Sequence, residues 1–480
     1  MNKKMVFHIV GRIIQVEALL LVLPLLVSVY YGEKCYLSFI ISIAIAAVTG
    51  TLLTLGSRVK SKIIYAKEGF VTVSLAWVVM SAIGALPFVI SGEIPSYVDA
   101  FFETVSGFTT TGASILTDVE ALSKGILFWR SFTHWIGGMG VLVFVMAIIP
   151  SITDRSIHII RAEMPGPIVG KIVPKVKNTA IILYIIYIAL TLAEILLLIA
   201  GKMPVYESVV HAFGTAGTGG FGIKADSIGG YSPYLQWVIT VFMFLFGINF
   251  NLYYLIILGK IKSVLKSEEL WAYIGIATAS AAIIAVNVHS MYSSISETVR
   301  HSAFQVSSII TTTGFATTDF DKWPTLSKTI LLLLMIVGAC AGSTGGGLKV
   351  SRVVLLFKTI KKELRHMLHP RSVNVVKFEE KTVSKSVITN VSVYFAVYVF
   401  LIILTFFLIS FDNFGIETNL TAAVSCFNNI GPGLAEVAPT ASYAGYNWFS
   451  KLVLSAAMLF GRLEIFPMLF LFSKPSWSKN

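Results

Sequence analysis

The stretch Ser307–Thr318, SSIITTTGFATT, decides the fold, because the chain contains three more versions of it. These are Ser106–Ser114 (SGFTTTGAS), Thr215–Gly222 (TAGTGGFG) and Cys426–Leu434 (CFNNIGPGL). Aligned on one glycine each, the four copies lie 108, 94 and 117 residues apart, at Gly112, Gly220, Gly314 and Gly431. Self-similarity at a nearly fixed period indicates repeated structural units. Since each copy lies between long apolar runs, the pattern predicts one membrane pore with four-fold pseudo-symmetry.

The composition is that of an integral membrane protein. Of the 480 residues, 55% are hydrophobic and 13% are charged, and mean hydropathy is +0.80. A soluble domain carries about 25% charged residues. The net charge of +12 is explained by positively charged cytoplasmic loops, so no nucleic-acid partner is expected. The three cysteines have no metal-binding spacing and predict no disulfide framework.

Long apolar runs predict the helices, because a membrane-spanning helix needs about 20 apolar residues. Two runs before the first repeat, Ile13–Tyr31 and Tyr36–Leu55, predict a helical hairpin. Each repeat then reads as an apolar helix, a shorter stretch, a Gly/Thr loop and a second apolar helix. The paired spans are Phe70–Ile90 and Ile126–Pro150, Ala180–Gly201 and Tyr234–Gly259, Trp271–His289 and the region from Thr329, and Val387–Phe411 and Trp448–Phe472. The shorter stretches are Ser96–Phe108, Val205–Thr215, Ile295–Ile310 and Glu417–Phe427.

These elements predict an all-α polytopic membrane protein with ten full spans and four re-entrant half-helices around one pore. The expected units are residues 1–68 for the N-terminal hairpin and 69–178, 179–268, 269–385 and 386–480 for the four repeats. Basic loops gather on one side, which the positive-inside rule makes cytoplasmic together with both termini. The opposite side is relatively rich in carboxylates, which raises the local cation concentration.

The four loops have the composition of a potassium filter. Glycine permits strained dihedral angles that turn carbonyls toward an axis, and converging carbonyls can replace the hydration shell of K+. Threonine adds neutral oxygens, and no loop core contains Asp or Glu, which favours K+ over a divalent ion. The expected filter residues are Thr110, Thr111, Gly112, Gly219, Gly220, Thr312, Thr313, Gly314, Asn429, Ile430 and Gly431. The expected potassium ligands are Thr110, Thr111, Thr218, Gly219, Thr312, Thr313, Asn429 and Ile430.

An alternative interpretation of the loops is that they are ordinary turns, which Thr/Gly clusters also form. Four copies that each follow a short helical stretch argue against that interpretation. In the second loop Gly219 and Gly220 both fit the alignment. Gly220 is chosen because its Gly-Phe pair then matches Gly314-Phe315.

A second irregular stretch, Gly338–Gly347 (GACAGSTGGG), follows an apolar run too short to cross a membrane. Each glycine costs about 1 kcal/mol in a helix relative to alanine, so this stretch is expected to unwind and can obstruct the pathway. Close helix packing through small residues is the alternative. A phosphate-binding loop is disfavoured because Lys349 comes one place late and no strand precedes it. The expected gate residues are Gly342, Ser343, Thr344, Gly345, Gly346, Gly347 and Arg462.

Arg462 is singled out because a charge within an apolar run is expensive and usually functional. Its guanidinium can donate to exposed carbonyls of the Gly342–Gly347 stretch. Glu464, two residues on, would face away on a helix and is not expected to be its partner. The alternative is snorkelling to the cytoplasmic interface. For Arg130, near the outer end of its helix, snorkelling is the expectation.

At these motifs the chain resembles the Trk/Ktr family of microbial potassium-uptake proteins, specifically its TrkH type. The resemblance covers essentially the whole chain, although loops two and four depart from the Thr-Thr-x-Gly pattern. It rests on Thr109–Gly112, Gly219–Phe221, Thr311–Phe315, Asn428–Gly433, Gly342–Lys349 (GSTGGGLK) and Gly461–Phe466 (GRLEIF).

The resemblance implies a bacterial or archaeal plasma-membrane protein whose intramembrane loop gates the pore. It also implies a homodimer and a cytosolic, nucleotide-binding regulatory ring of the TrkA type. Lys358–Lys385 and Arg155–Lys177 are candidate contacts for that ring, although anionic lipid headgroups explain these basic segments equally well.

The function expected from these features is a K+-translocating pore subunit without a covalent cofactor. The alternative is a symporter that couples K+ entry to H+ or Na+. Coupling usually needs an acidic group within the membrane, and the two candidates, Glu17 and Glu194, are expected near helix ends. No Ser/His/Asp set, paired buried carboxylates or HExxH motif is present, so the chain is not expected to be an enzyme.

Overall fold

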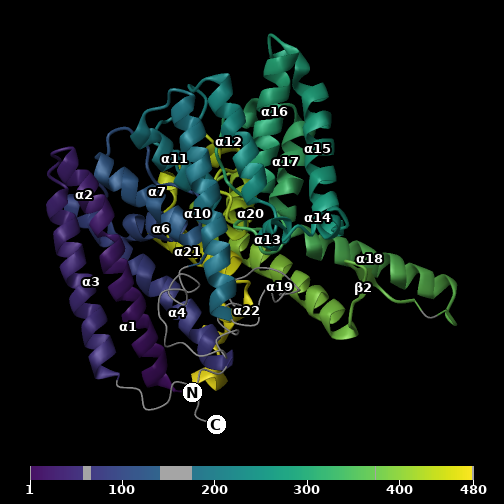
Figure 1. Ribbon diagram of the computed structural model, residues 1–480, viewed down its shortest axis with the longest axis horizontal. Helices are drawn as coiled ribbons and strands as arrows, with labels where there is room; N and C mark the ends of the chain where they lie inside the picture. Colours follow the sequence, from purple (N-terminus) through teal and green to yellow (C-terminus); the bar gives the residue numbers. More distant parts are fainter. Residues whose placement is uncertain (1, 58–65, 141–175, 373, 478–480) are drawn as a thin grey trace.

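The computed structural model describes residues 2–57, 66–140, 176–372 and 374–477, and these are almost entirely α-helical. The only strands among them are β1 (Lys377–Phe378) and β2 (Lys381–Thr382), which pair as an antiparallel hairpin. Figure 1 shows the helices gathered in one bundle, from which α18 (Val350–Leu368) and the β-hairpin project to one side. The predicted all-α fold is confirmed. The predicted segment Arg155–Lys177 lies almost wholly outside the described residues.

The chain begins with a helical hairpin at the edge of the bundle (Figure 1). Helices α1 (Lys3–Leu20) and α2 (Val22–Tyr30) form one apolar span, and α3 (Tyr36–Gly56) returns beside it. A Cβ atom built on Gly11 of α1 would lie 2.9 Å from the carbonyl oxygen of Gly50 in α3. Small residues therefore let the two backbones approach closely, as in other membrane helix pairs.

Four copies of one arrangement follow: a long helix, a short helix, a loop and a second helix. The first copy comprises α4 (Ala66–Gly84), α5 (Leu86–Ser91), α6 (Tyr97–Phe108) and α7 (Lys124–Gly138). The second comprises α10 (Val176–Ala200), α11 (Val205–Gly217), α12 (Pro233–Phe246), α13 (Phe250–Ile257) and α14 (Ile261–Leu265). The third comprises α15 (Glu268–Val288), α16 (Ile295–Ile310), α17 (Thr325–Val337) and α18. The fourth comprises α19 (Lys385–Ile409), α20 (Ile416–Asn428), α21 (Trp448–Arg462), α22 (Phe466–Phe472) and α23 (Lys474–Trp477).

The short helices α6, α11, α16 and α20 have 12, 13, 16 and 13 residues, which is too few to cross a membrane. Each has a carboxylate in its first turn, where the helix dipole favours negative charge. These carboxylates are Asp99, Glu207, Glu297 and Glu417. The opposite, partly negative helix ends lead directly into the four loops, so four C-terminal dipoles converge there.

The predicted ten full spans are not confirmed. Six described helices are long and apolar enough to cross a membrane, or seven if the bent pair α12 and α13 counts as one. The pair bends by 90°, so the expected span Tyr234–Gly259 is not straight. Likewise α17 ends at Val337, α21 ends at Arg462, and α7 ends at Gly138, beyond which residues 141–175 are not described. In the first, second and fourth repeats the helix that follows the loop is therefore shorter than the apolar run that predicted it, which hydropathy alone does not reveal.

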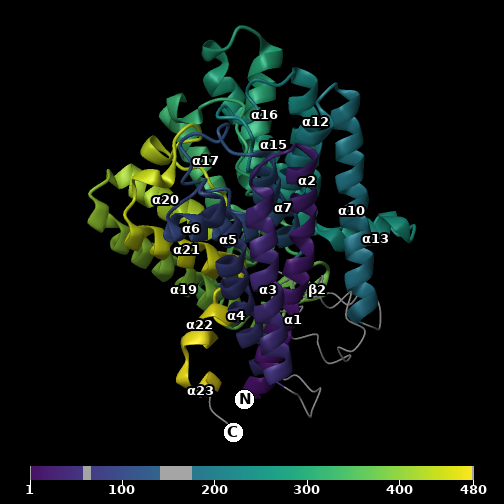
Figure 2. The ribbon, with the colours of Figure 1, turned by 90° about the vertical axis from the view of Figure 1, so that its left-hand side faces the viewer.

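Buried tyrosines join consecutive repeats. The Tyr187 hydroxyl, on the first helix of the second repeat, donates to the Trp135 carbonyl oxygen of α7 at 3.0 Å. The Tyr273 hydroxyl, on the first helix of the third repeat, donates to the Phe244 carbonyl oxygen of α12 at 3.1 Å. Both bonds link the start of one repeat to the end of the preceding one, and so preserve the order of the repeats around the bundle. Figure 2 shows that α1 begins and α23 ends at the same end of the molecule.

Candidate functional site

The four loops share one backbone conformation. A non-glycine residue with positive φ opens each loop: Thr110 (55°), Thr218 (55°), Thr312 (59°) and Asn429 (57°). Two residues later comes a glycine with positive φ: Gly112 (79°), Gly220 (78°), Gly314 (87°) and Gly431 (98°). L-residues rarely adopt such angles, and strain of this kind clusters at functional sites. Gly220, and not Gly219, is therefore the counterpart of the other three glycines.

The same glycines close a ring. A Cβ atom built on each glycine would overlap or crowd a backbone carbonyl oxygen of the next loop. The pairs, in order, are Gly112 with Gly219, Gly220 with Thr313, Gly314 with Ile430, and Gly431 with Thr111. In every case the carbonyl belongs to the residue before the next glycine. The loops thus meet in the order one, two, three, four and back to one, around a single axis.

Threonine hydroxyls brace this ring from within the loops. The hydroxyls of Thr109 and Thr111 lie 2.7 Å apart, and those of Thr311 and Thr313 lie 2.8 Å apart. The Asn429 amide donates to the Thr111 hydroxyl at 3.0 Å and so ties the fourth loop to the first. These hydroxyls are engaged in the wall, whereas the buried Thr110 hydroxyl has no hydrogen-bond partner. The oxygens that remain available for an ion therefore include the backbone carbonyls and this hydroxyl.

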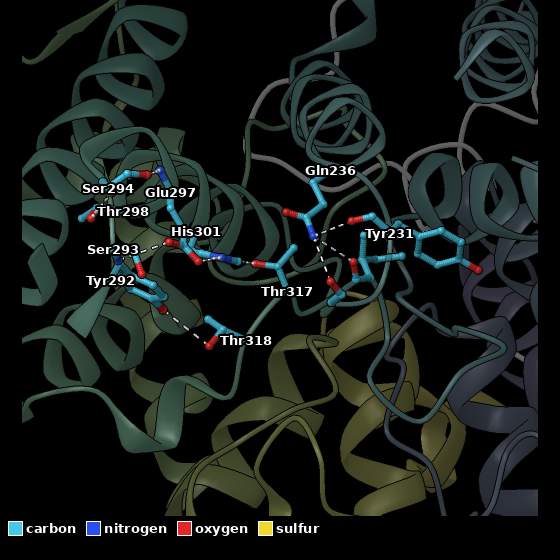
Figure 3. Close-up of polar contacts among 12 residues, drawn as sticks. Tyr231, Gln236, Tyr292, Ser293, Ser294, Glu297, Thr298, His301, Thr317 and Thr318 are labelled. Carbon is cyan, nitrogen blue, oxygen red and sulfur yellow. Dashed lines mark hydrogen bonds and ion pairs between the residues drawn. The ribbon is translucent and has the colours of Figure 1, made fainter. Parts of the chain in front are cut away.

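The outer connections are held by further polar contacts, drawn in Figure 3. His301 of α16 hydrogen-bonds the Thr317 hydroxyl at 2.8 Å, just after the third loop. The Gln236 side-chain amide donates to three carbonyl oxygens of the segment after the second loop, including that of Tyr231 at 3.1 Å. A small cavity of about 120 Å³ opens on this side and is lined by the glycines of all four loops. The ring therefore faces an opening.

Arg130 lies beside this opening, and the snorkelling expected for it is wrong. Its side chain is buried, and its Nε donates to Glu103 of α6 at 2.6 Å. Its Nη1 donates to the Gly222 carbonyl oxygen at 2.9 Å. Lys451 of α21 pairs in the same manner with Asp99 of α6, at 2.6 Å. Sequence reasoning missed both pairs because their members lie far apart in the chain.

The irregular stretch of the third repeat, Gly338–Lys349, is named the intramembrane segment. It has no helix, and Gly338, Gly342 and Gly347 have positive φ. Its Gly346 N–H donates to the Thr312 hydroxyl at 2.6 Å. A Cβ atom on Gly345 would lie 2.8 Å from the Thr311 carbonyl oxygen. The segment therefore lies against the helix-side ends of the loops, opposite the cavity.

The intramembrane segment also completes the broken helix of the second repeat. Its Cys340 N–H donates to the Gly247 carbonyl oxygen at 3.1 Å, and its Gly342 carbonyl oxygen accepts from the Phe250 N–H at 3.0 Å. A bend leaves helix backbone groups without their usual partners. The segment supplies those partners, so the bend between α12 and α13 and the unwinding after α17 stabilise each other.

Arg462 connects the intramembrane segment to two repeats. Its Nη1 donates to the Thr344 carbonyl oxygen at 2.7 Å, and its Nη2 donates to the Gly138 carbonyl oxygen at 2.8 Å and to that of Gly137. The guanidinium thus caps the end of α7 and contacts the segment, which agrees with the predicted bonding and not with snorkelling. Glu464 pairs with Arg352. It lies beyond the end of α21 with a φ of 61°, so the helical geometry assumed for it does not apply.

Three other ionisable residues are buried. Lys349, which was considered only for a phosphate loop, is buried and donates to the Gly345 carbonyl oxygen within the segment. Glu17 and Glu194 are fully buried. Glu17 lies within the Lys3–Tyr30 span and not at its end, against expectation, whereas Glu194 lies near the end of α10, as expected. The sequence argument against coupled transport therefore no longer holds for Glu17. Among the described residues, no group of three His, Cys, Asp or Glu side chains could hold a metal ion.

Comparison with known proteins gives one consistent result. Residues 36–479 match the family model of TrkH, described as a cation transport protein. The chain is 35% identical to the Trk system potassium uptake protein TrkH of Salmonella typhimurium, covering 99% of this chain and 100% of that protein. It is 32% identical to the Trk system potassium uptake protein TrkG of Escherichia coli, covering 99% and 98%.

A solved structure is similar along the whole length. The crystal structure of the potassium transporter TrkH from Vibrio parahaemolyticus superposes with a TM-score of 0.89 at 31% identity and covers 100% of both chains. The family description also agrees with the prediction that the chain is not an enzyme. The chain belongs to the TrkH family of cation transport proteins.

Proposed function

We propose that this chain is the potassium-translocating pore subunit of a Trk-type uptake system. The closed ring of four loops is the observation that carries the proposal, because it brings carbonyl oxygens of four repeats to one axis. The relatives named as potassium uptake proteins support the choice of ion.

In this proposal the carbonyls of Thr111, Gly219, Thr313 and Ile430 form one layer of ligands, and those of Thr110, Thr218, Thr312 and Asn429 form the next. Carbonyl cages of this kind replace the hydration shell of K+. Two acids of α6, Glu103 and Asp99, are paired with Arg130 and Lys451, so they do not place free charge on the ring. A neutral cage suits a monovalent ion better than a divalent one.

The four loops differ in sequence, but they fit this proposal because they share one backbone geometry. The second and fourth loops lack the Thr-Thr pair, yet their φ angles match those of the first and third loops. A carbonyl oxygen is supplied equally by Gly219, Ile430 or a threonine. The loop side chains therefore differ in the hydrogen bonds that support the ring, and the proposed ligands are backbone carbonyl oxygens in all four loops.

The intramembrane segment, with Arg462, is proposed as the gate. Three observations support this: the segment's position against Thr311 and Thr312, its non-helical backbone, and the Arg462 contact with Thr344. At about 8 Å and an effective dielectric of about 20, one fixed charge raises a barrier of roughly 2 kcal/mol to a cation. That barrier corresponds to about a thirtyfold change in occupancy.

Arg462→Ala is expected to increase potassium flux and to leave the K+/Na+ permeability ratio nearly unchanged, because the guanidinium donates to Thr344, Gly137 and Gly138, which are not proposed ligands of the ion. Arg462→Lys keeps the charge but gathers its donors on one nitrogen in place of the planar guanidinium fork that reaches separate carbonyls, so it is expected to raise flux less. Planar-bilayer currents of the purified variants measure both quantities. Wild-type flux in a normally folded Arg462→Ala variant would show that the residue serves only to cap α7.

The cellular arrangement is proposed from the basic loops and the family. The protein is placed in a bacterial or archaeal plasma membrane with both termini cytoplasmic, as a homodimer in contact with lipid. A TrkA-like nucleotide-binding subunit is its proposed cytosolic partner. The relatives' name, Trk system, supports a system of more than one component. Within the described residues, the candidate contact is Lys358–Lys385, which includes the projecting end of α18 and the β-hairpin (Figure 1).

Radioactive rubidium influx into liposomes containing the purified chain tests this function. A selective pore gives influx driven by the rubidium gradient alone, and that influx is expected to be unchanged by a pH gradient or by added Na+. Influx that requires either gradient would favour the coupled symporter, for which the buried Glu17 and Glu194 are candidate coupling groups. An absence of influx under all conditions, in a folded sample with Arg462→Ala included, would contradict transport by this chain alone.

A further inference from the structure

Glu269 is a buried carboxylate that no part of the proposed ion path uses. It lies in the first turn of α15 and is 6% exposed. Its Oε1 accepts from the backbone N–H of Ala341 at 2.7 Å and from that of Ser351 at 3.1 Å. Ala341 belongs to the intramembrane segment, and Ser351 is in the first turn of α18. One carboxylate oxygen therefore accepts hydrogen bonds from the intramembrane segment and from the start of the helix that follows it.

The local structure explains why a carboxylate is needed there. Helix α18 begins directly after the segment, and its N-cap residue, Lys349, provides no side-chain cap. The first N–H groups of a helix have no partner within the helix and carry a partial positive charge. Glu269 supplies the missing acceptor from another helix. Its removal would leave two buried N–H groups without an acceptor, and the segment would lose a fixed point.

The backbone of Glu269 is in turn held by the β-hairpin. Glu379, at the hairpin turn, accepts from the Ser267 hydroxyl at 2.9 Å and from the Glu269 N–H at 3.2 Å. Lys266 pairs with Glu380 of the same turn at 3.0 Å. Glu269 is thus bonded to the hairpin through its main chain and to the intramembrane segment through its side chain.

A cavity of about 700 Å³ lies beside these contacts. Glu269, Ala341, Ser351 and Glu379 all line it. The cavity leaves space on one side of the contacts, while Phe378 of the hairpin packs with Leu355 and Val391, so a shift of the hairpin would move this small hydrophobic cluster with it. The β-hairpin projects from the bundle (Figure 1) and is therefore placed where another molecule can reach it.

We propose that Glu269 is a positioning residue of the intramembrane segment, and that displacement of the β-hairpin (Lys377–Thr382) acts on the segment through it. This inference rests on the proposed role of the segment as the gate. Glu269 does not touch the ion path; it acts through Ala341 and Ser351. Movement of the hairpin turns the first turn of α15, withdraws the carboxylate and releases the segment.

Rubidium influx into liposomes, with no partner protein present, tests this inference. Glu269→Ala is expected to raise influx by about tenfold, because two hydrogen bonds to a charged acceptor are lost. Glu269→Gln keeps an acceptor oxygen and is expected to stay near the wild type. Glu379→Ala is expected to raise influx by a smaller factor. Glu33→Ala removes a carboxylate that likewise accepts two backbone N–H groups, those of Lys124 and Gly125 at the start of α7, and serves as the matched control with unchanged influx.

The deletion of Gly345–Gly347 separates this inference from the proposed gate. If the deletion raises influx and Glu269→Ala does not, the proposed role of Glu269 is wrong, while the proposed role of the segment as the gate is kept. If the deletion leaves influx unchanged, the segment is not the gate. In the deletion background Glu269→Ala is expected to add nothing, and a further increase there would overturn the inference as general destabilisation. Should Glu269→Ala not fold, wild-type influx in Glu379→Ala would likewise overturn it.

Discussion

Gly314→Ser is expected to lower the K+/Na+ permeability ratio by at least about tenfold, which corresponds to about 1.4 kcal/mol of lost discrimination. Gly314 has a φ of 87°, which costs a residue with a side chain about 1–3 kcal/mol. Its Cβ atom would also overlap the Ile430 carbonyl oxygen and lie 3.0 Å from Pro432 Cδ. The serine must push that carbonyl out of the ring. Reversal potentials with K+ on one side of a bilayer and Na+ on the other measure the ratio.

Gly92→Ser is the matched control for this experiment. Gly92 has a φ of 79°, and a Cβ atom built on it meets nothing within 4 Å. The control therefore carries similar backbone strain without crowding the ring, and its permeability ratio is expected to equal that of the wild type. An unchanged ratio in a well-folded Gly314→Ser variant would mean that Gly314 does not shape the selective part of the pathway.

Deletion of Gly345–Gly347 is expected to raise basal rubidium influx on the order of tenfold, equivalent to about 1.4 kcal/mol of removed barrier. Gly345 lies against the Thr311 carbonyl oxygen and Gly346 against that of Asn428, and the Gly346 N–H donates to the Thr312 hydroxyl. Shortening the segment withdraws it from the helix-side ends of the loops. Influx into liposomes measures the effect, with the amount of inserted protein determined on the same vesicles.

Deletion of Pro370–Ser372 is the control for chain shortening. These residues are exposed, follow α18 and lie far along the chain from the segment. Their removal is expected to leave influx unchanged in the absence of a partner protein. Wild-type or lower influx in a correctly inserted Gly345–Gly347 deletion would favour the alternative interpretation, in which the glycines serve only to pack helices closely.

The four-fold repeat could be predicted from the sequence because its signal is local. These loops need glycine where φ is positive and a side chain would also meet the next loop, and Gly112, Gly314 and Gly431 occur at matching positions. The choice of Gly220 over Gly219 also followed from a local match, the Gly-Phe pair. The short helices could be predicted because length alone excludes a crossing.

The breaks in the second helices could not be predicted from hydropathy, because their cause is tertiary. Tyr234–Gly259 is an apolar run, yet it bends by 90° between Phe246 and Phe250. The bend is stabilised by hydrogen bonds from Cys340 and Gly342, almost 100 residues further along the chain. A hydropathy profile considers each side chain separately and contains no information about hydrogen-bond partners elsewhere in the chain.

The positions of buried charged residues could not be predicted either, because their partners lie on other helices. Arg130 was expected at an interface because its partner, Glu103, lies on another helix of the same repeat. Glu269 was not singled out at all, because its position at the start of an apolar run is typical of an ordinary helix N-terminus. Its two acceptor contacts, with Ala341 and Ser351, become visible only when the third repeat is folded.

The central claim is that one monovalent cation binds within the ring of four carbonyls. Anomalous diffraction from crystals grown with thallium in place of potassium tests it most directly, because thallium substitutes for K+ and scatters strongly. We expect anomalous peaks on the axis between the carbonyl oxygens of Thr111, Gly219, Thr313 and Ile430, and their disappearance when Na+ replaces thallium. Peaks confined to carboxylates such as Asp226, with none inside the ring, would contradict the account.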